Sequence, residues 1–226
     1  MKIAIVAALD SELARLRKET DALRDVPCPS GSFAQGTIGP HDVALVLLSV
    51  GKVNAAAKTQ AVIDRFQPDL IINTGIAGAL APEVRVLDTV IATEIGYHDF
   101  DPDLMERFSP FVRTFTPEPA RVEAASHAAS AQEMNVHKGG IATGDLFVSS
   151  DADKKRIREA TQALCVEMEG CAVGHVAHLN GLPFLVLRTI SDSADDNADF
   201  DYDTFEQQAA DRSAGLLLEL LLRHIP

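Results

Sequence analysis

Tryptophan is absent from this 226-residue sequence, tyrosine occurs twice and cysteine three times. The cysteines, Cys28, Cys165 and Cys171, form no CxxC pair, and their odd number excludes a fully paired disulfide framework. A reduced, cytoplasmic setting is therefore expected. The histidines show no HxxxH or HExxH spacing, so the sequence predicts no metal site.

Long apolar runs and positive charge are also scarce. No run approaches the roughly 20 residues that a membrane helix needs, and acids follow the first apolar run at once, unlike in a signal peptide. With 20 Lys and Arg against 33 Asp and Glu, the net charge is -13, which would repel a phosphate backbone. We therefore expect neither a membrane nor a nucleic-acid partner, and we interpret the acid excess as an aid to solubility.

Short apolar runs alternate with helical patterns along the chain. The runs predict strands at residues 3–9, 32–38, 42–49, 70–75 and 86–96 and within 139–148. Helices are predicted after Asp10, as the N-cap, and at residues 52–66, 118–133, 151–160 and 203–224. Residues 99–116 show little periodicity and are interpreted as a loop or lid. The alternation predicts an α/β fold with a mixed or parallel sheet covered by helices on both faces, as a single domain over residues 1–226.

Two polar clusters each follow a strand-like run in the last third of the chain. Glu167 and Glu169 lie where an apolar run meets a helix, and Arg188, Ser191 and Asp192 end the run PFLVLRTIS. Open α/β sheets place their ligands at the carboxyl ends of strands, so the two clusters can meet at one site. Acids that bind hydroxyls, an arginine and a further acid suit hydrolysis or transfer of a sugar-like group. The alternatives to a functional role are that Glu167 and Glu169 are only favourable acids at the start of a helix, and that Asp192 is only an N-cap or turn residue.

Three other positions follow strand-like runs. Glu12 lies in the first turn of the first helix, where the helix dipole stabilises a carboxylate, although such residues are often only favourable helix starts. The glycine-rich segment NTGIAGAL is predicted to be a loop that allows close approach through Gly75 and Gly78. Phe147 could stack on a flat base while the backbone of Val148 binds the base edge, or Phe147 could be a core residue.

Ordered motifs along nearly the whole chain resemble one family. They are KIAIVAALDSE, SVGKVNAA, PDLIINTGIAG, YHDFD, ATGDLFV, VEMEG and PFLVLRTISDSAD. With these motifs the sequence is similar to the 5′-methylthioadenosine/S-adenosylhomocysteine nucleosidases of the purine nucleoside phosphorylase superfamily. The resemblance implies a three-layer αβα fold around a central mixed twisted sheet, usually as a homodimer. It also implies hydrolysis of the N-glycosidic bond of an adenine nucleoside, with no metal or organic cofactor.

The resemblance also implies roles for individual residues. Glu12 would activate water, Glu169 would hold the ribose hydroxyls and Arg188 would help to fix both the water and Glu169. Asp192, oriented by Ser191, would protonate nitrogen 7 of adenine. The residues expected to line the bound nucleoside are Met105, Phe147, Val148, Met168 and Tyr202.

The sequence departs from the family pattern at two places. Ile76 stands where the family usually has serine beside the water site, and one contact is lost there. The 99–116 lid is shorter than usual, with Pro102 and Met105 at positions where the family commonly has valine and phenylalanine. In the family this region lines the pocket for the 5′-substituent, partly across the dimer interface, so the preferred 5′ group is left open.

Three alternatives stay open. A nucleoside phosphorylase of the same fold would need a GDPxR-like phosphate loop, whereas residues 7–10 are Ala-Ala-Leu-Asp and no GDP occurs. A futalosine or aminodeoxyfutalosine hydrolase would have similar base and ribose sites. A nucleoside-binding module without catalysis is supported only by Ile76.

Overall fold

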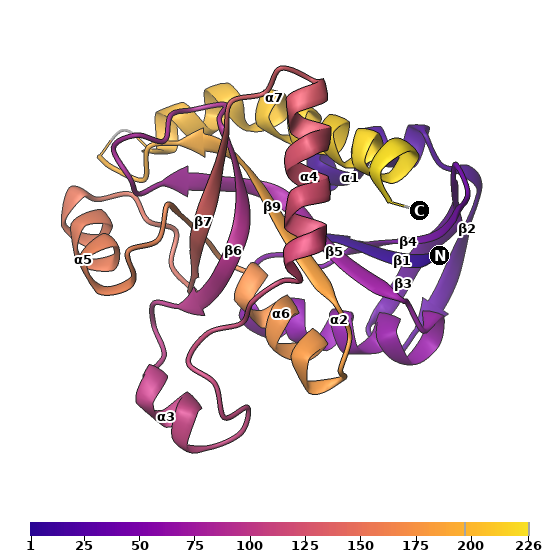
Figure 1. Ribbon diagram of the computed structural model, residues 1–226, viewed down its shortest axis with the longest axis horizontal. Coiled ribbons are helices and arrows are strands. Elements are labelled where there is room, and N and C mark those ends of the chain that lie inside the picture. Colours follow the sequence, from indigo (N-terminus) through magenta and orange to yellow (C-terminus); the bar gives the residue numbers. More distant parts are fainter. Residues whose placement is uncertain (197, 226) are drawn as a thin grey trace.

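The computed structural model describes residues 1–196 and 198–225, and its centre is a nine-stranded mixed sheet (Figure 1). The strand order is β2-β3-β4-β1-β5-β8-β7-β6-β9, and β9 also pairs with β5, so the last five strands close into a ring. The strands are β1 (Lys2–Ala7), β2 (Asp21–Cys28), β3 (Gly31–Ile38), β4 (His41–Leu47), β5 (Leu70–Ala79), β6 (Thr89–Tyr97), β7 (Val136–Thr143), β8 (Cys165–Glu167) and β9 (Phe184–Asp192).

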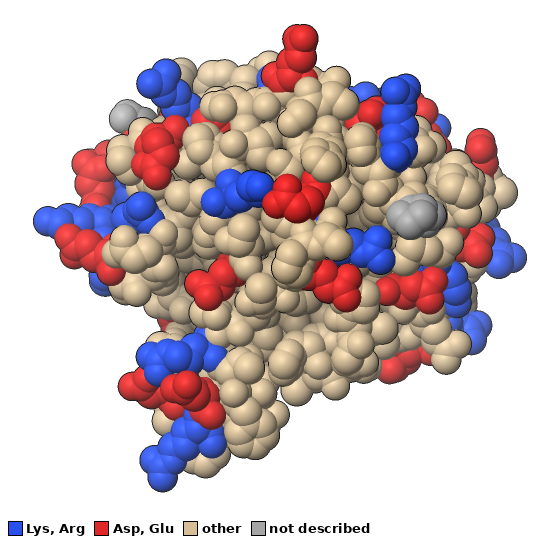
Figure 2. Space-filling view, viewed as in Figure 1, with Lys and Arg blue, Asp and Glu red and all other residues tan. Residues whose placement is uncertain are grey.

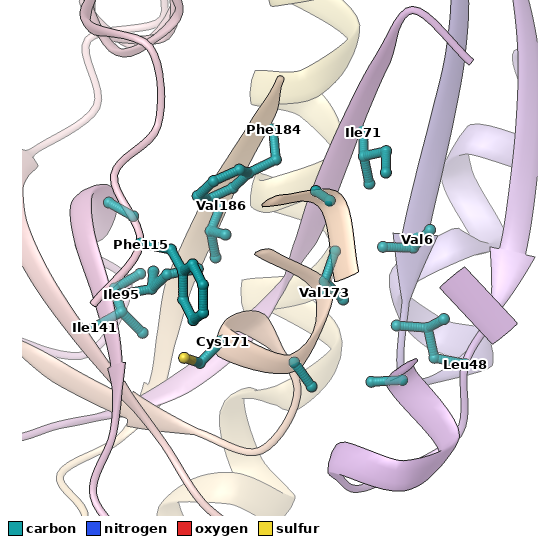
Figure 3. Close-up of a cluster of buried hydrophobic side chains, with 14 of the residues drawn as sticks. Val6, Leu48, Ile71, Ile95, Phe115, Ile141, Cys171, Val173, Phe184 and Val186 are labelled. Atoms are coloured by element: carbon teal, nitrogen blue, oxygen red, sulfur yellow. The ribbon is translucent and has the colours of Figure 1, made fainter. Parts of the chain in front are cut away.

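Helices cover both faces of this sheet (Figure 1). The helices are α1 (Asp10–Lys18), α2 (Lys52–Phe66), α3 (Pro102–Arg107), α4 (Pro119–Ala131), α5 (Asp151–Thr161), α6 (Gly170–Leu179) and α7 (Ala198–Glu219), followed by a π-helical turn (Leu220–His224). On one face, side chains of α1, α4 and α7 pack on the sheet. On the other face, side chains of α2 and α6 pack on the sheet. Figure 3 shows part of this second cluster, where Val173 of α6 lies between Val6 and Val186 of the sheet. Alternate residues along the strands point to opposite faces of the sheet and pack into two separate hydrophobic cores. This confirms the predicted αβα layers.

Three local predictions were wrong. Strand β2 was not predicted, because its residues are nearly all exposed and carry no alternating apolar pattern at the sheet edge. The glycine-rich segment 75–79 is not a loop but the end of β5, since it pairs with β9 on one side and β8 on the other. Helix α1 begins at Asp10 itself, and the N-cap is Leu9.

Residues 99–116 project from the body of the molecule and contain α3 rather than loop alone (Figure 1). Three of their phenylalanines, Phe100, Phe108 and Phe111, are exposed. Phe115 is instead buried, and its backbone bonds to that of Ile95. The segment is therefore anchored at its end and exposed at its tip.

Acidic and basic groups interleave on the face shown in Figure 2, including on the α3 projection at the lower left. Within residues 1–196 and 198–225, no helix combines the length and apolar character that crossing a membrane requires.

Candidate active site

A cavity of about 470 Å³ lies at the carboxyl ends of β1, β5, β8 and β9. Strands β1, β5 and β9 run parallel and end at the same edge of the sheet, and β8 pairs antiparallel with the end of β5, so residues far apart in the chain meet there. Of the eleven residues to which the family resemblance gives a place in the site, nine line it: Glu12, Ile76, Phe147, Val148, Met168, Glu169, Ser191, Asp192 and Tyr202. Two others, Arg188 and Met105, do not.

Glu12 is held by backbone amides at the wall of the cavity. One carboxylate oxygen accepts from the Leu9 amide and the other from the Ile76 amide, each at 2.9 Å. A Cβ on Gly75 would come within 2.4 Å of Glu12 Oε1, so glycine is required there for the carboxylate to fit. Burial raises the pKa of Glu12, while the charge of Arg188 acts in the opposite direction. A raised pKa makes this carboxylate a stronger base than an exposed glutamate, as a general base requires.

Glu169 lies at the start of α6 with its carboxylate directed toward the start of α2. Its Oε1 accepts from the Gly51 amide at 2.7 Å, which leaves Oε2 with no protein donor among the described contacts. Burial, followed by the nearby Glu167 charge, raises the pKa of Glu169 to about 8. A carboxylate with an unused oxygen can accept hydrogen bonds from ligand hydroxyls.

Asp192 ends β9, and its neighbours hold both of its oxygens. The Ser191 hydroxyl donates to Oδ2 at 2.7 Å, and the Ala194 amide donates to Oδ1 at 2.9 Å. A Cβ on Gly78 would come within 2.7 Å of Oδ1, so this glycine too makes room for a carboxylate. Burial raises the pKa of Asp192, which favours the protonated form that a general acid needs.

Arg188, which the resemblance implies would help to fix Glu169, makes its direct ion pair with Glu167 instead. Arg188 is buried beneath the cavity, where its Nη2 donates to Glu167 Oε2 at 2.5 Å and to Asn73 Oδ1 at 2.6 Å. The reason is strand order: Arg188 on β9 lies next to β5, which carries Asn73 and pairs in turn with β8, where Glu167 is the last residue. Arg188 therefore does not line the cavity. Its hydrogen bonds join Glu167 of β8 to Asn73 of β5 beneath the cavity.

Aromatic and apolar side chains also line the cavity. Phe147 follows β7 and is 41% exposed, and the edge of its ring contacts Tyr202 of α7 with ring centroids 5.7 Å apart. Val148 and Met168 add apolar surface. Burial, with nearby carboxylates, raises the pKa of Tyr202 to about 12. A half-exposed ring over an apolar slot suits a flat heterocycle.

Met105 was predicted to be a wall of the cavity and is not one. Its side chain is 2% exposed and belongs to the buried cluster that contains Ile95 and Phe115. Helix α3 packs this methionine inward on its own chain, while the other residues of α3 stay exposed. Ile76, in contrast, does line the cavity beside Glu12 and contributes a backbone amide rather than a hydroxyl.

Several contributors had no local signal in the sequence. Gly51 supplies an amide to Glu169, Val50 lines the cavity, and Asn73 and Thr143 bind the buried ion pair from below. The motifs SVGKVNAA and ATGDLFV contain three of them, but only their tertiary contacts reveal what they do. Within the described residues, no three His, Cys, Asp or Glu side chains are grouped so that they could hold a metal ion.

Comparison with known proteins places this chain among relatives along its whole length. The phosphorylase superfamily profile matches residues 2–222. The 5′-methylthioadenosine/S-adenosylhomocysteine nucleosidase of Anoxybacillus flavithermus is 37% identical over 229 residues, covering 96% of each chain.

Solved structures agree with this. S-adenosylhomocysteine nucleosidase from Streptococcus pyogenes, in complex with 5-methylthiotubericidin, has a TM-score of 0.95 at 33% identity, covering 100% of this chain and 98% of that one. Futalosine hydrolase of Helicobacter pylori has a TM-score of 0.91 at 26% identity, covering 98% of this chain and 97% of that one. With full-length matches to both profile and relatives, this chain belongs to the 5′-methylthioadenosine/S-adenosylhomocysteine nucleosidase family of the phosphorylase superfamily.

Proposed function

We propose that this protein hydrolyses the N-glycosidic bond of 5′-methylthioadenosine and S-adenosylhomocysteine, releasing adenine and the 5′-thioribose. Three buried carboxylates, Glu12, Glu169 and Asp192, line one cavity together with the partly exposed ring of Phe147, and this arrangement carries the proposal. The names of the relatives support the choice of substrate.

In the proposed reaction, Asp192 protonates the leaving adenine at nitrogen 7. Glycosidic cleavage builds positive charge on the sugar and negative charge on the base, so a proton delivered to the base lowers the barrier. Ser191 keeps the Asp192 carboxyl oriented, and Phe147 stacks on the purine while the backbone of Val148 binds its edge. The raised pKa of Asp192 supports this role, because the acid must hold its proton until cleavage.

Glu12 and Glu169 act on the sugar side of the bond. Glu12, anchored by two amides, accepts a proton from the water that attacks the anomeric carbon. Glu169 binds the ribose hydroxyls with the oxygen that Gly51 leaves unused, and Met168 packs against the ring. In its ionised form, which its pKa of about 8 favours at and above that pH, Glu169 also adds negative charge that stabilises the oxocarbenium-like state.

The composition of the cavity wall favours hydrolysis over phosphorolysis. No Lys, Arg or His is among the described residues that line it, whereas a phosphate co-substrate needs positive charge or several free amides. The amide of Ile76 already donates to Glu12. Water is therefore the nucleophile that this wall accommodates.

The direct test measures adenine release from 5′-methylthioadenosine with and without inorganic phosphate. We expect release at the same rate in both. Acceleration by phosphate would identify a phosphorylase, and binding without release would identify a nucleoside-binding module. Release from aminodeoxyfutalosine alone would assign the substrate of the alternative hydrolase.

We also infer that residues 1–226 act as one domain and that two copies form a homodimer. The exposed Phe100, Phe108 and Phe111 on the α3 projection support the dimer, because exposed aromatic clusters mark interfaces. A partner packed there would bury the tip that the single chain leaves in solvent.

A further inference from the structure

Glu167 stands two residues before Glu169 and has a different environment. It lines the cavity, but protein donors occupy both of its oxygens. Oε1 accepts from the Thr143 hydroxyl, and Oε2 accepts from Arg188 at 2.5 Å and from the amides of Glu169 and Gly170 at 2.9 and 2.7 Å. With these donors in place, Glu167 has little capacity left for a ligand.

These bonds join separate elements of the site. Thr143 ends β7 and Arg188 belongs to β9, while the two amides form the turn that presents Met168 and Glu169. Arg188 continues the network to Asn73 of β5, whose side-chain amide donates to the Val6 carbonyl of β1 at 3.0 Å. One carboxylate thus lies at the centre of contacts that reach β1, the strand preceding Glu12.

Glu167 also determines where the positive charge of Arg188 acts. The two side chains are 2% and 3% exposed, so solvent screens their interaction little. Three charged groups face Glu169 from the elements around it: Glu167 of β8, Arg188 of β9 and Glu12 of α1. With Glu167 in place, Arg188 is paired directly with it, and neither Glu12 nor Glu169 has an arginine in hydrogen-bond contact.

We propose that Glu167 is a positioning residue of this site: it orients the Met168–Glu169 turn and, by pairing directly with Arg188, weakens the effect of that positive charge on Glu12 and Glu169. This inference rests on the proposed nucleosidase function. Glu167 acts through its neighbours and not on the substrate. Its neutral isostere should therefore change the pH at which the site works as well as its efficiency.

The test compares Glu167→Gln with wild type by the pH profile of kcat/KM for 5′-methylthioadenosine. Glutamine retains an acceptor for Arg188 and the amides but lacks the charge. We expect kcat/KM to fall about 10- to 100-fold, the loss typical of small misplacements of reacting groups. The acid limb should move to lower pH, because Glu169 loses a neighbouring negative charge and the charge of Arg188 acts more strongly on both Glu12 and Glu169.

Two further variants separate position from charge. Thr143→Val removes the bond to Oε1 but keeps the ion pair, so we expect a smaller fall in kcat/KM with the acid limb unmoved. Glu123→Gln removes an ion-paired carboxylate on α4 that does not line the cavity, and it should leave the whole profile unchanged.

Wild-type kcat/KM in Glu167→Gln would overturn the proposal, as would an equal loss at every pH with no shift of the limb. If Glu167→Gln does not fold, wild-type kcat/KM in Thr143→Val would overturn the positioning role. Failure of the wild-type protein itself to release adenine would instead overturn the proposed function.

Discussion

An arginine pairs with carboxylates both beneath the cavity and on the α3 projection, but the two pairs differ in their surroundings. Arg188 and Glu167 are 2% and 3% exposed, whereas Arg113 and its partner Asp103 are 49% and 76% exposed. Removing one member of the buried pair strands a charge away from water, which is costly. Water and salt can replace either member of the exposed pair at little cost.

The same contrast extends to function. The cavity contains carboxylates, among them Glu12 and Asp192, whose burial raises their pKa, whereas the α3 projection carries exposed aromatic rings and charges. We expect substitutions in and beneath the cavity to affect chemistry and stability, and substitutions on the α3 projection to affect association.

The largest effect is expected for Asp192→Asn. Asparagine keeps the shape and can still accept from Ser191, but it carries no proton for adenine. A general acid contributes about 10²- to 10⁴-fold, so kcat should fall by that factor with an unchanged melting temperature. Adenine release measured by absorbance checks this, with Asp103→Asn on the projection as the control. Near-wild-type turnover would refute the assignment of Asp192.

Glu12→Gln should separate binding from turnover. Glu12 is assigned to water and not to the base or ribose, so hydrolysis should fall at least about 10²-fold while the nucleoside still binds. Calorimetry with 5′-methylthioadenosine measures the binding. If binding disappears together with turnover, Glu12 has a structural or ligand-binding role instead.

Arg188→Met tests the comparison of ion pairs directly. It leaves Glu167 buried without its counter-charge, and we expect a loss of about 3–5 kcal/mol in the free energy of unfolding. Arg113→Met on the projection should leave stability unchanged within error. Urea unfolding of both variants provides the measurement. Equal effects would show that burial does not distinguish the two pairs.

The raised pKa of Glu169 predicts a pH-dependent effect on stability. Burial and Glu167 raise this pKa from 4.5 to about 8, so the folded chain holds the proton more tightly than the unfolded chain. Both states are protonated at low pH, and the folded state loses relative stability as the pH rises from about 4.5 to about 8. Glu169→Gln removes that loss, so its melting temperature should exceed wild type by more near pH 8 than near pH 5. A difference that does not vary with pH would contradict this, and Glu123→Gln is the control.

The projection should affect association and leave folding intact. Phe111 is 69% exposed, and Phe111→Asp should shift the mass in solution from dimer to monomer without lowering the melting temperature. Phe200→Asp, at an equally exposed phenylalanine on α7, should leave the dimer intact. Light scattering that gives 24.2 kDa for the wild-type protein at micromolar concentration would remove the idea of a dimer.

Local patterns were enough to predict much of the fold. Uninterrupted apolar runs identified β1 and the first part of β5, and an alanine-rich stretch identified α2 at its observed bounds. Strand-end position predicted that the clusters of Glu169 and Asp192 can meet, and the family resemblance added Glu12; all three line the cavity. Whether a segment forms a strand or a helix, and which side chains follow a strand, depends on neighbours within a few residues along the chain. Sequence alone therefore determined these properties.

Partner choice depended on the tertiary structure. Arg188 pairs with Glu167 rather than Glu169, because β9 lies beside β5 and the start of α6 turns Glu169 toward Gly51. Met105 is buried because α3 packs on its own chain, and residues 75–79 are strand because β8 and β9 supply hydrogen-bond partners. Sequence alone thus determined which side chains reach the strand ends. Only the folded sheet decided which of them contact one another, because those contacts join residues that are distant along the chain.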